Sequence, residues 1–160
     1  MVKVGEPAPD FEAVASNGTT VRLSALRGRH VVLYFFPKAF TPGCTAQTRR
    51  FRDNYPELAA LGAEVMGVSI DTPDTQCRFA QKETVPFPMI ADPQRTISRA
   101  FGVLWPLFHV DKRVTFVIDP GGVVEAVFHH EFQVNRHLDD VVRHLKKKSS
   151  ATAASRRSSS

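Results

Sequence analysis

Three short apolar runs dominate the pattern of hydrophobic and polar positions along the chain. They read VVLYFF, VMGVSI and VTFVID, at residues 31–36, 65–70 and 114–119. Each run is rich in β-branched and aromatic residues and lacks polar alternation, which is typical of strands covered on both faces. The pattern therefore predicts a sheet with helices on both sides.

Helical periodicity fills the intervals between and after these runs. Residues 41–61 place Phe51, Leu58 and Leu61 on one side, and Pro56 is expected to break or kink this helix. The sequence predicts three further helices, over residues 72–83, 92–101 and 135–148. The first two open with proline at the first helical position, and the third carries its cations at its C-terminal end.

Turn residues complete the predicted fold. Residues 119–122, Asp-Pro-Gly-Gly, separate two apolar runs and predict a hairpin, so the sheet should contain antiparallel strands. Residues 1–28 contain GEPAPDF and NGTTVRL and are expected to form an N-terminal extension against the main sheet. This order of elements indicates an α/β fold of the thioredoxin type, with a central mixed sheet flanked by helices.

The composition fits one domain followed by a charged tail. The 160 residues are 42% apolar, and the formal net charge is +5. Five of the 21 basic residues lie beyond residue 145, which leaves 16 basic against 16 acidic residues in a domain over positions 1–145. Residues 146–160, KKKSSATAASRRSSS, hold few apolar side chains and are predicted to form a disordered basic tail rich in Ser and Ala.

These features limit the partners and the compartment. Because the domain itself is neutral, nucleic-acid binding is not expected, although the tail leaves a nuclear address open. No apolar run approaches the ~18 residues that span a bilayer, and the N-terminus lacks a secretory pattern, so we expect no membrane partner and a cytoplasmic location. Two cysteines without a secretory context predict reduced thiols.

Cys44 is the main candidate for chemistry. Thr41 fits an N-cap and Pro42 the first helical position, so Cys44 falls at the third position, where its sulfur faces unpaired backbone N–H groups. The positive end of the helix dipole favours the thiolate, and cysteines placed this way can have pKa values of ~3.5–7.5. This position favours a nucleophile, and a packed small hydrophobic residue is the alternative.

Metal binding and dithiol chemistry are poorly supported by the sequence. No histidine stands at ligand spacing from Cys44 and no second cysteine is near it, so no metal is expected there. The C-x-x-C pair of a disulfide reductase is absent. HHEF, at residues 129–132, has two adjacent histidines, which point to opposite faces of a strand and cannot chelate one ion together.

The residues around Cys44 resemble a known active-site signature. YFFPKAFTPGC contains the pattern P-x-x-x-T-x-x-C, formed by Pro37, Thr41 and Cys44, and this is similar to the peroxiredoxin family. The motifs GEPAPDF, FRD, PFPMIAD, FGV and KRVTFVID follow in family order, so the resemblance covers nearly all of residues 3–145. The chain looks most like the Q-type, or bacterioferritin-comigratory-protein-like, branch, with some likeness to the one-cysteine alkyl hydroperoxide reductase E type.

The resemblance implies a role for each signature residue. Cys44 would be the peroxidatic cysteine, whose thiolate attacks the peroxide and becomes sulfenic acid. Thr41 and Arg113 would bind the peroxide, and the Arg113 cation would also favour the thiolate. Pro37 would shield the sulfur from water. No metal or organic cofactor takes part in this chemistry. Without the resemblance, Arg113 reads as an ordinary surface arginine.

The same resemblance suggests a substrate pocket. Gly43 would let a ligand approach backbone N–H groups closely. Phe36, Phe40 and Trp105 are the expected apolar lining. Trp105 belongs to LWPLFHV, residues 104–110, which is more apolar than a solvated loop. This segment should pack on the core, form a wall of the pocket or contact a second copy of the chain.

Two positions depart from the Q-type pattern. The branch often has a resolving cysteine where this chain has Arg49, so the local disulfide cannot form. It also frequently has a glutamate where this chain has Gln47. Cys77 is the remaining candidate, although the branch's other resolving position corresponds to Ala80. Cys77 lies about 200° from Phe79 around a helix, so an inward Phe79 would leave it fairly exposed. Cys77 either resolves the sulfenic acid or is incidental in a one-cysteine enzyme.

Together these inferences predict a thiol-dependent peroxidase. It would reduce hydrogen peroxide and small organic hydroperoxides and take electrons from thioredoxin or another thiol reductant. We expect a monomer or a weak homodimer. The alternative is a non-catalytic, thioredoxin-like binding module with a basic tail.

Overall fold

A five-stranded mixed sheet forms the centre of the protein. In this computed structural model, which describes residues 1–107 and 110–158, the strand order is β5-β4-β3-β6-β7. The strands are β3 (His30–Phe35), β4 (Ala63–Ser69), β5 (Met89–Ala91), β6 (Val114–Ile118) and β7 (Val124–His129). β3 pairs parallel with β4 and antiparallel with β6, which confirms the predicted mixed sheet.

The central strand β3 is covered on both faces. Even-numbered positions from Val32 to Phe36 enter one core, and odd-numbered positions from Val31 to Phe35 enter the other. Successive side chains of a strand point to opposite faces, so an uninterrupted apolar run fills two cores at once. The three apolar runs of the sequence therefore became β3, β4 and β6 as predicted.

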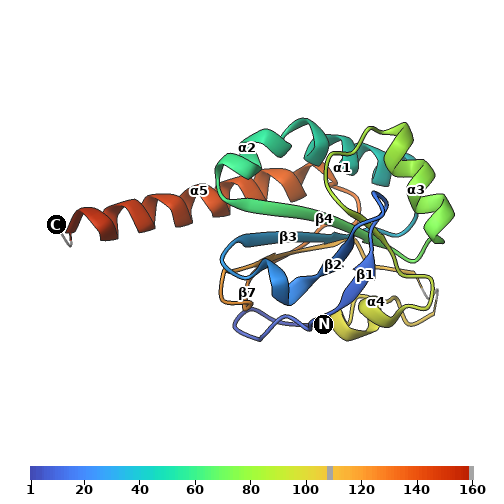
Figure 1. The fold of residues 1–160 in the computed structure, drawn as a ribbon, viewed down its shortest axis with the longest axis horizontal. Coiled ribbons are helices and arrows are strands. Elements are labelled where there is room, and N and C mark those ends of the chain that lie inside the picture. Colours follow the sequence, from blue (N-terminus) through green and yellow to red (C-terminus); the bar gives the residue numbers. More distant parts are fainter. Residues whose placement is uncertain (108–109, 159–160) are drawn as a thin grey trace.

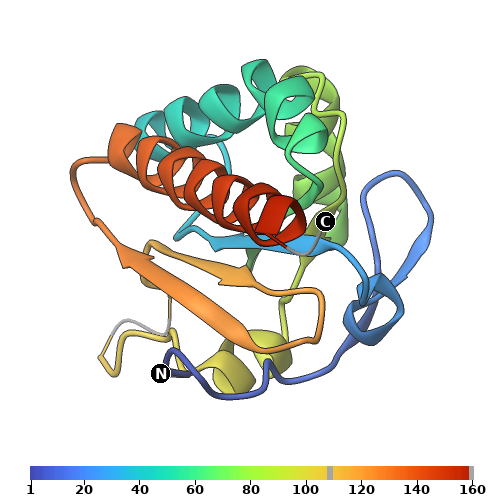
Figure 2. The same ribbon diagram turned by 90° about the vertical axis from the view of Figure 1, so that its left-hand side faces the viewer.

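Helices form a layer on each side of this sheet (Figures 1 and 2). Side chains of α1, α2, α3 and α5 pack in the core that contains Val32, whereas α4 and the N-terminal segment pack in the core that contains Val31. Asn54 separates α1 from α2 next to Pro56, as the sequence indicated. The helices are α1 (Pro42–Asp53), α2 (Tyr55–Ala60), α3 (Pro73–Lys82), α4 (Thr96–Phe101) and α5 (Asn135–Ser158).

The N-terminal extension lies along the sheet. It forms a small hairpin of β1 (Glu12–Val14) and β2 (Thr20–Arg22), followed by a 3₁₀ turn at Leu23–Leu26. Isolated bridges pair Pro7 with Val123 and Ala15 with Ile90, so the extension reaches from the β7 edge to the β5 edge. The predicted position of this segment is confirmed.

The last helix is longer than the sequence suggested. The periodicity predicted a helix over residues 135–148 and a flexible tail over residues 146–160, but α5 continues to Ser158. Residues 135–158 contain neither Gly nor Pro, and Ala, Lys and Arg favour helix even where no core is available. Leu145 is the last core side chain among those whose burial the structure describes, and beyond it the helix projects away from the sheet (Figure 1).

None of the helices in the described part of the chain combines the length and apolarity needed to cross a bilayer.

Candidate active site

Cys44 lies in the first turn of α1, directly after the strand β3. Thr41 is the N-cap and Pro42 begins the helix, as predicted, and the first helical hydrogen bond runs from the N–H of Thr45 to the carbonyl of Thr41, at 2.9 Å. Phe40 has a φ of 67°, so the chain reverses direction just before the cap. Cys44 is fully buried in the core of the α1 face.

The Thr41 hydroxyl does not cap the helix. It donates instead to the carbonyl of Lys38, with 2.7 Å between the two oxygens. A hydroxyl that donates its only proton still has lone pairs that can accept a hydrogen bond. Thr41 is therefore the N-cap through its backbone alone, and its hydroxyl oxygen is oriented as an acceptor.

Arg113 approaches Cys44 from the neighbouring strand. It lies just before β6, and antiparallel pairing of Val114 with Phe35 brings the start of β6 beside the end of β3. Its Nη1 lies 3.4 Å from Cys44 Sγ and 2.9 Å from Gln47 Oε1. Arg113 is only 7% exposed, so the guanidinium is a buried cation next to the sulfur rather than a surface group.

Gln47 holds the guanidinium from one turn further along α1. The side chain is buried, its Oε1 accepts from Arg113, and its Nε2 has no hydrogen-bond partner among the described residues. No carboxylate of the described residues forms an ion pair with Arg113. A thiolate at Cys44 would supply the missing negative charge.

Glu131 holds Arg113 from the other side and was not identified from the sequence. Its carbonyl oxygen accepts from Arg113 Nε at 3.1 Å, and its Oε1 accepts from the Arg113 backbone N–H at 3.1 Å. The same Oε1 lies 2.6 Å from His129 Nε2. The available signal was an acidic residue just after the strand that pairs with the Arg113 strand.

A cavity of about 640 Å³ opens beside this group. Aliphatic and aromatic side chains form most of its wall, and the Arg113 guanidinium and Glu131 are its charged members. Gly43 is also in the wall, and a Cβ added there would lie 3.2 Å from Arg113 Nη2. The lining residues are Pro37, Gly43, Trp105, Val110, Arg113, Glu131, Phe132 and Val134.

The comparisons with known proteins identify the family. Residues 4–127 match the model described as the AhpC/TSA family. The chain is 38% identical to chloroplastic peroxiredoxin Q of Populus jackii, over 90% of this chain and 68% of that protein. It is also 38% identical to peroxiredoxin Bcp of Escherichia coli K12, over 91% and 96% of the two chains. The solved structure of peroxidoxin BcpB from Mycobacterium tuberculosis gives a TM-score of 0.85 at 37% identity, over 92% and 98%.

The chain belongs to the AhpC/TSA family. Its named relatives are peroxiredoxins of the Q and Bcp types, so the predicted family, the thioredoxin-like fold and the thiol-dependent peroxidase function are confirmed. The alternative of a non-catalytic binding module is not favoured.

Two of the expected pocket residues do not line the cavity of this peroxiredoxin. Phe36 is fully buried in the core, with its ring 5.6 Å from Tyr34. Phe40 is 45% exposed and packs on Phe79, 5.3 Å between ring centroids. Strand alternation directs Phe36 into the α1-side core, and the left-handed backbone at Phe40 turns that side chain elsewhere. Gly43 and Trp105 do line the cavity. Phe108 and His109, in the segment 104–110, lie outside the described residues.

Cys77 is less exposed than helical spacing suggested. Phe79 is fully buried as expected, but Cys77 is half-buried, and its Sγ lies 3.8 Å from the Ser16 carbonyl oxygen. Ser16 follows β1, so the N-terminal hairpin covers a helix face that spacing alone would leave open. Both cysteines are free thiols.

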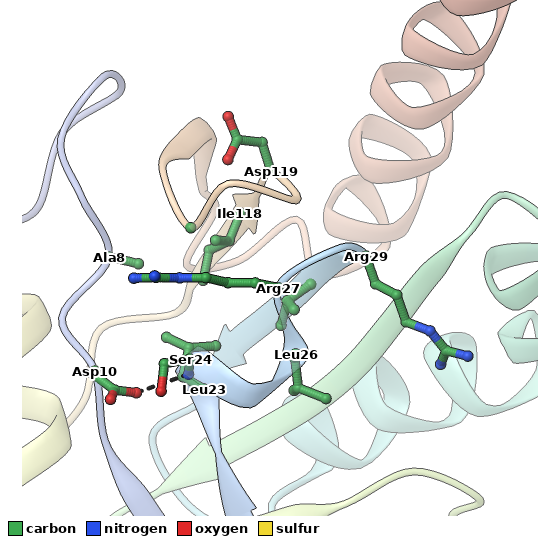
Figure 3. Close-up of a pocket in the computed structure, with 11 residues that line it drawn as sticks. Ala8, Asp10, Leu23, Ser24, Leu26, Arg27, Arg29, Ile118 and Asp119 are labelled. Atoms are coloured by element: carbon green, nitrogen blue, oxygen red, sulfur yellow. Dashed lines mark hydrogen bonds between the residues drawn. The ribbon is translucent and has the colours of Figure 1, made fainter.

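A second, smaller cavity lies at the other end of the same strands (Figure 3). It measures about 20 Å³ and is lined by residues near the start of β3 and the end of β6, including Val31 and Ile118. Arg27 extends across it toward Ala8, whereas Arg29 points away. A cavity of this size holds about one water molecule, so it offers no second site for an organic peroxide.

Proposed function

We propose that Cys44 is the nucleophile of this peroxidase and that Arg113 and Thr41 hold the peroxide against its sulfur. The observation that carries the proposal is the 3.4 Å contact between Arg113 Nη1 and Cys44 Sγ at the wall of the cavity. A positioned cation favours the thiolate and also stabilises negative charge on a leaving oxygen.

The reaction is a two-electron displacement at oxygen. The thiolate sulfur attacks one peroxide oxygen, the S–O bond forms as the O–O bond breaks, and the other oxygen leaves and takes a proton as water or an alcohol. Cys44 is thereby oxidised to sulfenic acid and the peroxide is reduced. A thiol then attacks the sulfenic sulfur and expels water, and a second thiol reduces the resulting disulfide.

The surrounding residues divide the positioning between them. The Thr41 oxygen, whose proton is donated to Lys38, can accept the O–H of the peroxide. Arg113 can donate to the peroxide oxygens through Nη2, which lies over Gly43. Pro37 has no N–H and lines the cavity, which supports the proposed exclusion of water from the sulfur.

The cavity supports a range of peroxides. Hydrogen peroxide needs only the polar group around Arg113, whereas the apolar wall formed by Trp105, Val110 and Val134 suits a small organic substituent. A bacterioferritin comigratory protein of Xanthomonas campestris, 30% identical to this chain with a TM-score of 0.83, is described as having alkyl peroxide reduction activity.

Re-reduction can follow either of two routes, and both end at thioredoxin or another thiol. In one, Cys77 leaves the Ser16 carbonyl and forms a disulfide with Cys44 after the start of α1 unwinds, because a disulfide needs Cα atoms within about 7 Å. In the other, an external thiol reduces the sulfenic acid directly.

Intact mass after one equivalent of peroxide distinguishes the two routes. Loss of two hydrogens that disappears in Cys77→Ser indicates the first route, and retention of one added oxygen the second.

Stopped-flow peroxide consumption tests the function itself. The wild-type chain should consume hydrogen peroxide and an alkyl hydroperoxide rapidly with thioredoxin as donor, and Cys44→Ser should not. Equal rates in the two proteins would remove the proposal.

Two free thiols support a reducing, cytoplasmic setting. We also propose a monomer or weak homodimer, in which the 96% exposed Phe132 at the cavity would be the contact, and sedimentation at several concentrations tests this.

A further inference from the structure

The side chain of Glu131 makes a contact that the peroxidase chemistry described so far leaves without a use. Its Oε1 accepts from the backbone N–H of Arg113 at 3.1 Å and lies 2.6 Å from His129 Nε2. Arg113 precedes β6, so its N–H is not part of the strand ladder and needs a partner elsewhere. The side chain therefore ties the end of β7 to the residue that carries the guanidinium.

The main chain of Glu131 completes this attachment. Its carbonyl oxygen accepts from Arg113 Nε at 3.1 Å. Nε and Nη1 are fixed in one rigid plane, so a donor held at Nε directs Nη1 toward Cys44 and Gln47. The carboxylate of Glu131 fixes this residue to the Arg113 backbone, and this contact in turn keeps the Glu131 carbonyl in place beside Arg113 Nε.

Gln47 offers the guanidinium no carboxylate that could replace this attachment. Gln47 contributes one neutral acceptor to Nη1, and the part of the chain that the structure describes has no ion pair to the guanidinium. A side chain held by single neutral hydrogen bonds keeps much of its rotamer freedom, and long cationic side chains lose the most entropy when they are ordered.

We propose that Glu131 is a positioning residue for the peroxidase reaction, which fixes Arg113 at its backbone N–H and its Nε so that Nη1 meets the Cys44 sulfur and Nη2 faces the cavity. This rests on the function proposed for Cys44 and Arg113. Glu131 acts through two acceptor oxygens and not through its charge. Its carboxylate accepts from the Arg113 backbone N–H, and the guanidinium is held by its main-chain carbonyl. An amide at this position should therefore keep most of its effect.

The test compares two reactions of the same sulfur. Reaction with hydrogen peroxide needs the oriented guanidinium, whereas alkylation by iodoacetamide needs only the thiolate. At a pH where the thiol is fully ionised in all variants, Glu131→Ala should lower the rate constant with peroxide by about tenfold or more and leave the alkylation rate within about twofold. Glu131→Gln, whose side-chain oxygen still accepts, should retain at least about half of the wild-type peroxide rate.

Glu125→Ala is the matched control. Glu125 lies on β7 at the end away from Arg113, and it also accepts from histidines, His30 at 2.8 Å and His144 at 3.0 Å. This variant should lose stability comparably and keep both rates. The proposal is overturned if Glu131→Ala keeps the wild-type peroxide rate, if its two rates fall together, or if Glu131→Gln is as slow as Glu131→Ala. A wild-type chain without peroxidase activity would instead remove the proposed function.

Discussion

Arg113 Nη1 lies 3.4 Å from Cys44 Sγ, although the two residues are 69 positions apart in the sequence. The contact exists because β3 and β6 are antiparallel neighbours, so the end of one strand and the start of the other meet at the same edge of the sheet. The guanidinium is buried and its other side-chain partners are an amide oxygen and a backbone carbonyl. A buried cation without a carboxylate partner is costly unless a negative charge lies nearby, and this supports the role proposed for Cys44.

Replacing Arg113 should therefore affect reactivity toward peroxide strongly. Arg113→Met keeps a long apolar stem but removes the charge and every N–H donor. We expect the second-order rate constant with hydrogen peroxide to fall by about 100-fold or more, as for loss of a positioned donor to a leaving oxygen. Competition kinetics against a second peroxidase measures this. Arg143→Met, at an exposed position on α5, is the control and should keep the wild-type rate.

Gly43 should tolerate no side chain, because the guanidinium lies over it. A Cβ at this position would stand 3.2 Å from Arg113 Nη2 and 3.8 Å from Val134 Cγ1. Gly43→Ala should displace the guanidinium by a few tenths of an ångström and lower the peroxide rate by about tenfold. Gly121→Ala, in the β6–β7 turn, should keep the rate. Wild-type kinetics in Gly43→Ala would contradict the assigned role of Nη2.

Local sequence pattern was sufficient to predict the elements that carry Cys44. The apolar run before Pro37 is a strand because both of its faces are covered, and Thr41 and Pro42 define where α1 begins. Cys44 could therefore be placed at a helix N-terminus without any knowledge of the tertiary structure. Its charged neighbour was identified only through the resemblance to peroxiredoxins.

Contacts between distant elements could not be read in the same way. The β6–β7 hairpin was predicted, but its register shifts between Val117 and Ile118. A one-residue shift reverses the face of every following side chain, so counting from the turn could not show that Glu131 reaches Arg113. The prediction that Phe36 lines the pocket was wrong for a similar reason. The sequence does not show which face of the sheet α1 covers, and Phe36 points into the core on that face.

The distal part of α5 should be dispensable for catalysis. Among the side chains that the structure describes, Leu145 is the last in the core, and the ion pairs of Lys146 with Glu57 and of Lys148 with Glu125 precede residue 150. A chain that ends at Ser149 should keep the peroxide rate and a melting temperature within about 2 °C of the full chain. A loss of either would contradict this. Salt-dependent DNA binding that the truncation abolishes would contradict the expectation that the chain does not bind nucleic acid.

Asp111 introduces a pH dependence of stability next to the Arg113 strand. It is fully buried, and neither carboxylate oxygen has a hydrogen-bond partner among the described residues. Burial raises the pKa of Asp111 to about 7, and the Ser98 hydroxyl beside it offsets part of that rise. The folded protein therefore keeps a proton that the unfolded chain releases near pH 4, so this group's contribution to stability is complete below about pH 4 and is lost as the pH rises to about 7.

Asp111→Asn should remove this loss. Below pH 4 the variant and the wild type should unfold at similar denaturant concentrations, and at pH 8 the variant should be more stable by about 2–4 kcal/mol, because it carries no charge to bury. Both proteins also contain His137, and burial lowers the pKa of His137 to about 4. This histidine adds stability to both proteins as the pH rises from 4 to 6.5, which opposes the effect of Asp111 in the wild type. The difference between the two proteins isolates Asp111. Urea unfolding from about pH 3 to about pH 8 measures it, with Asp139→Asn, an exposed partner of Arg50, as the control. A difference that does not change with pH would show that folding does not raise the pKa of Asp111.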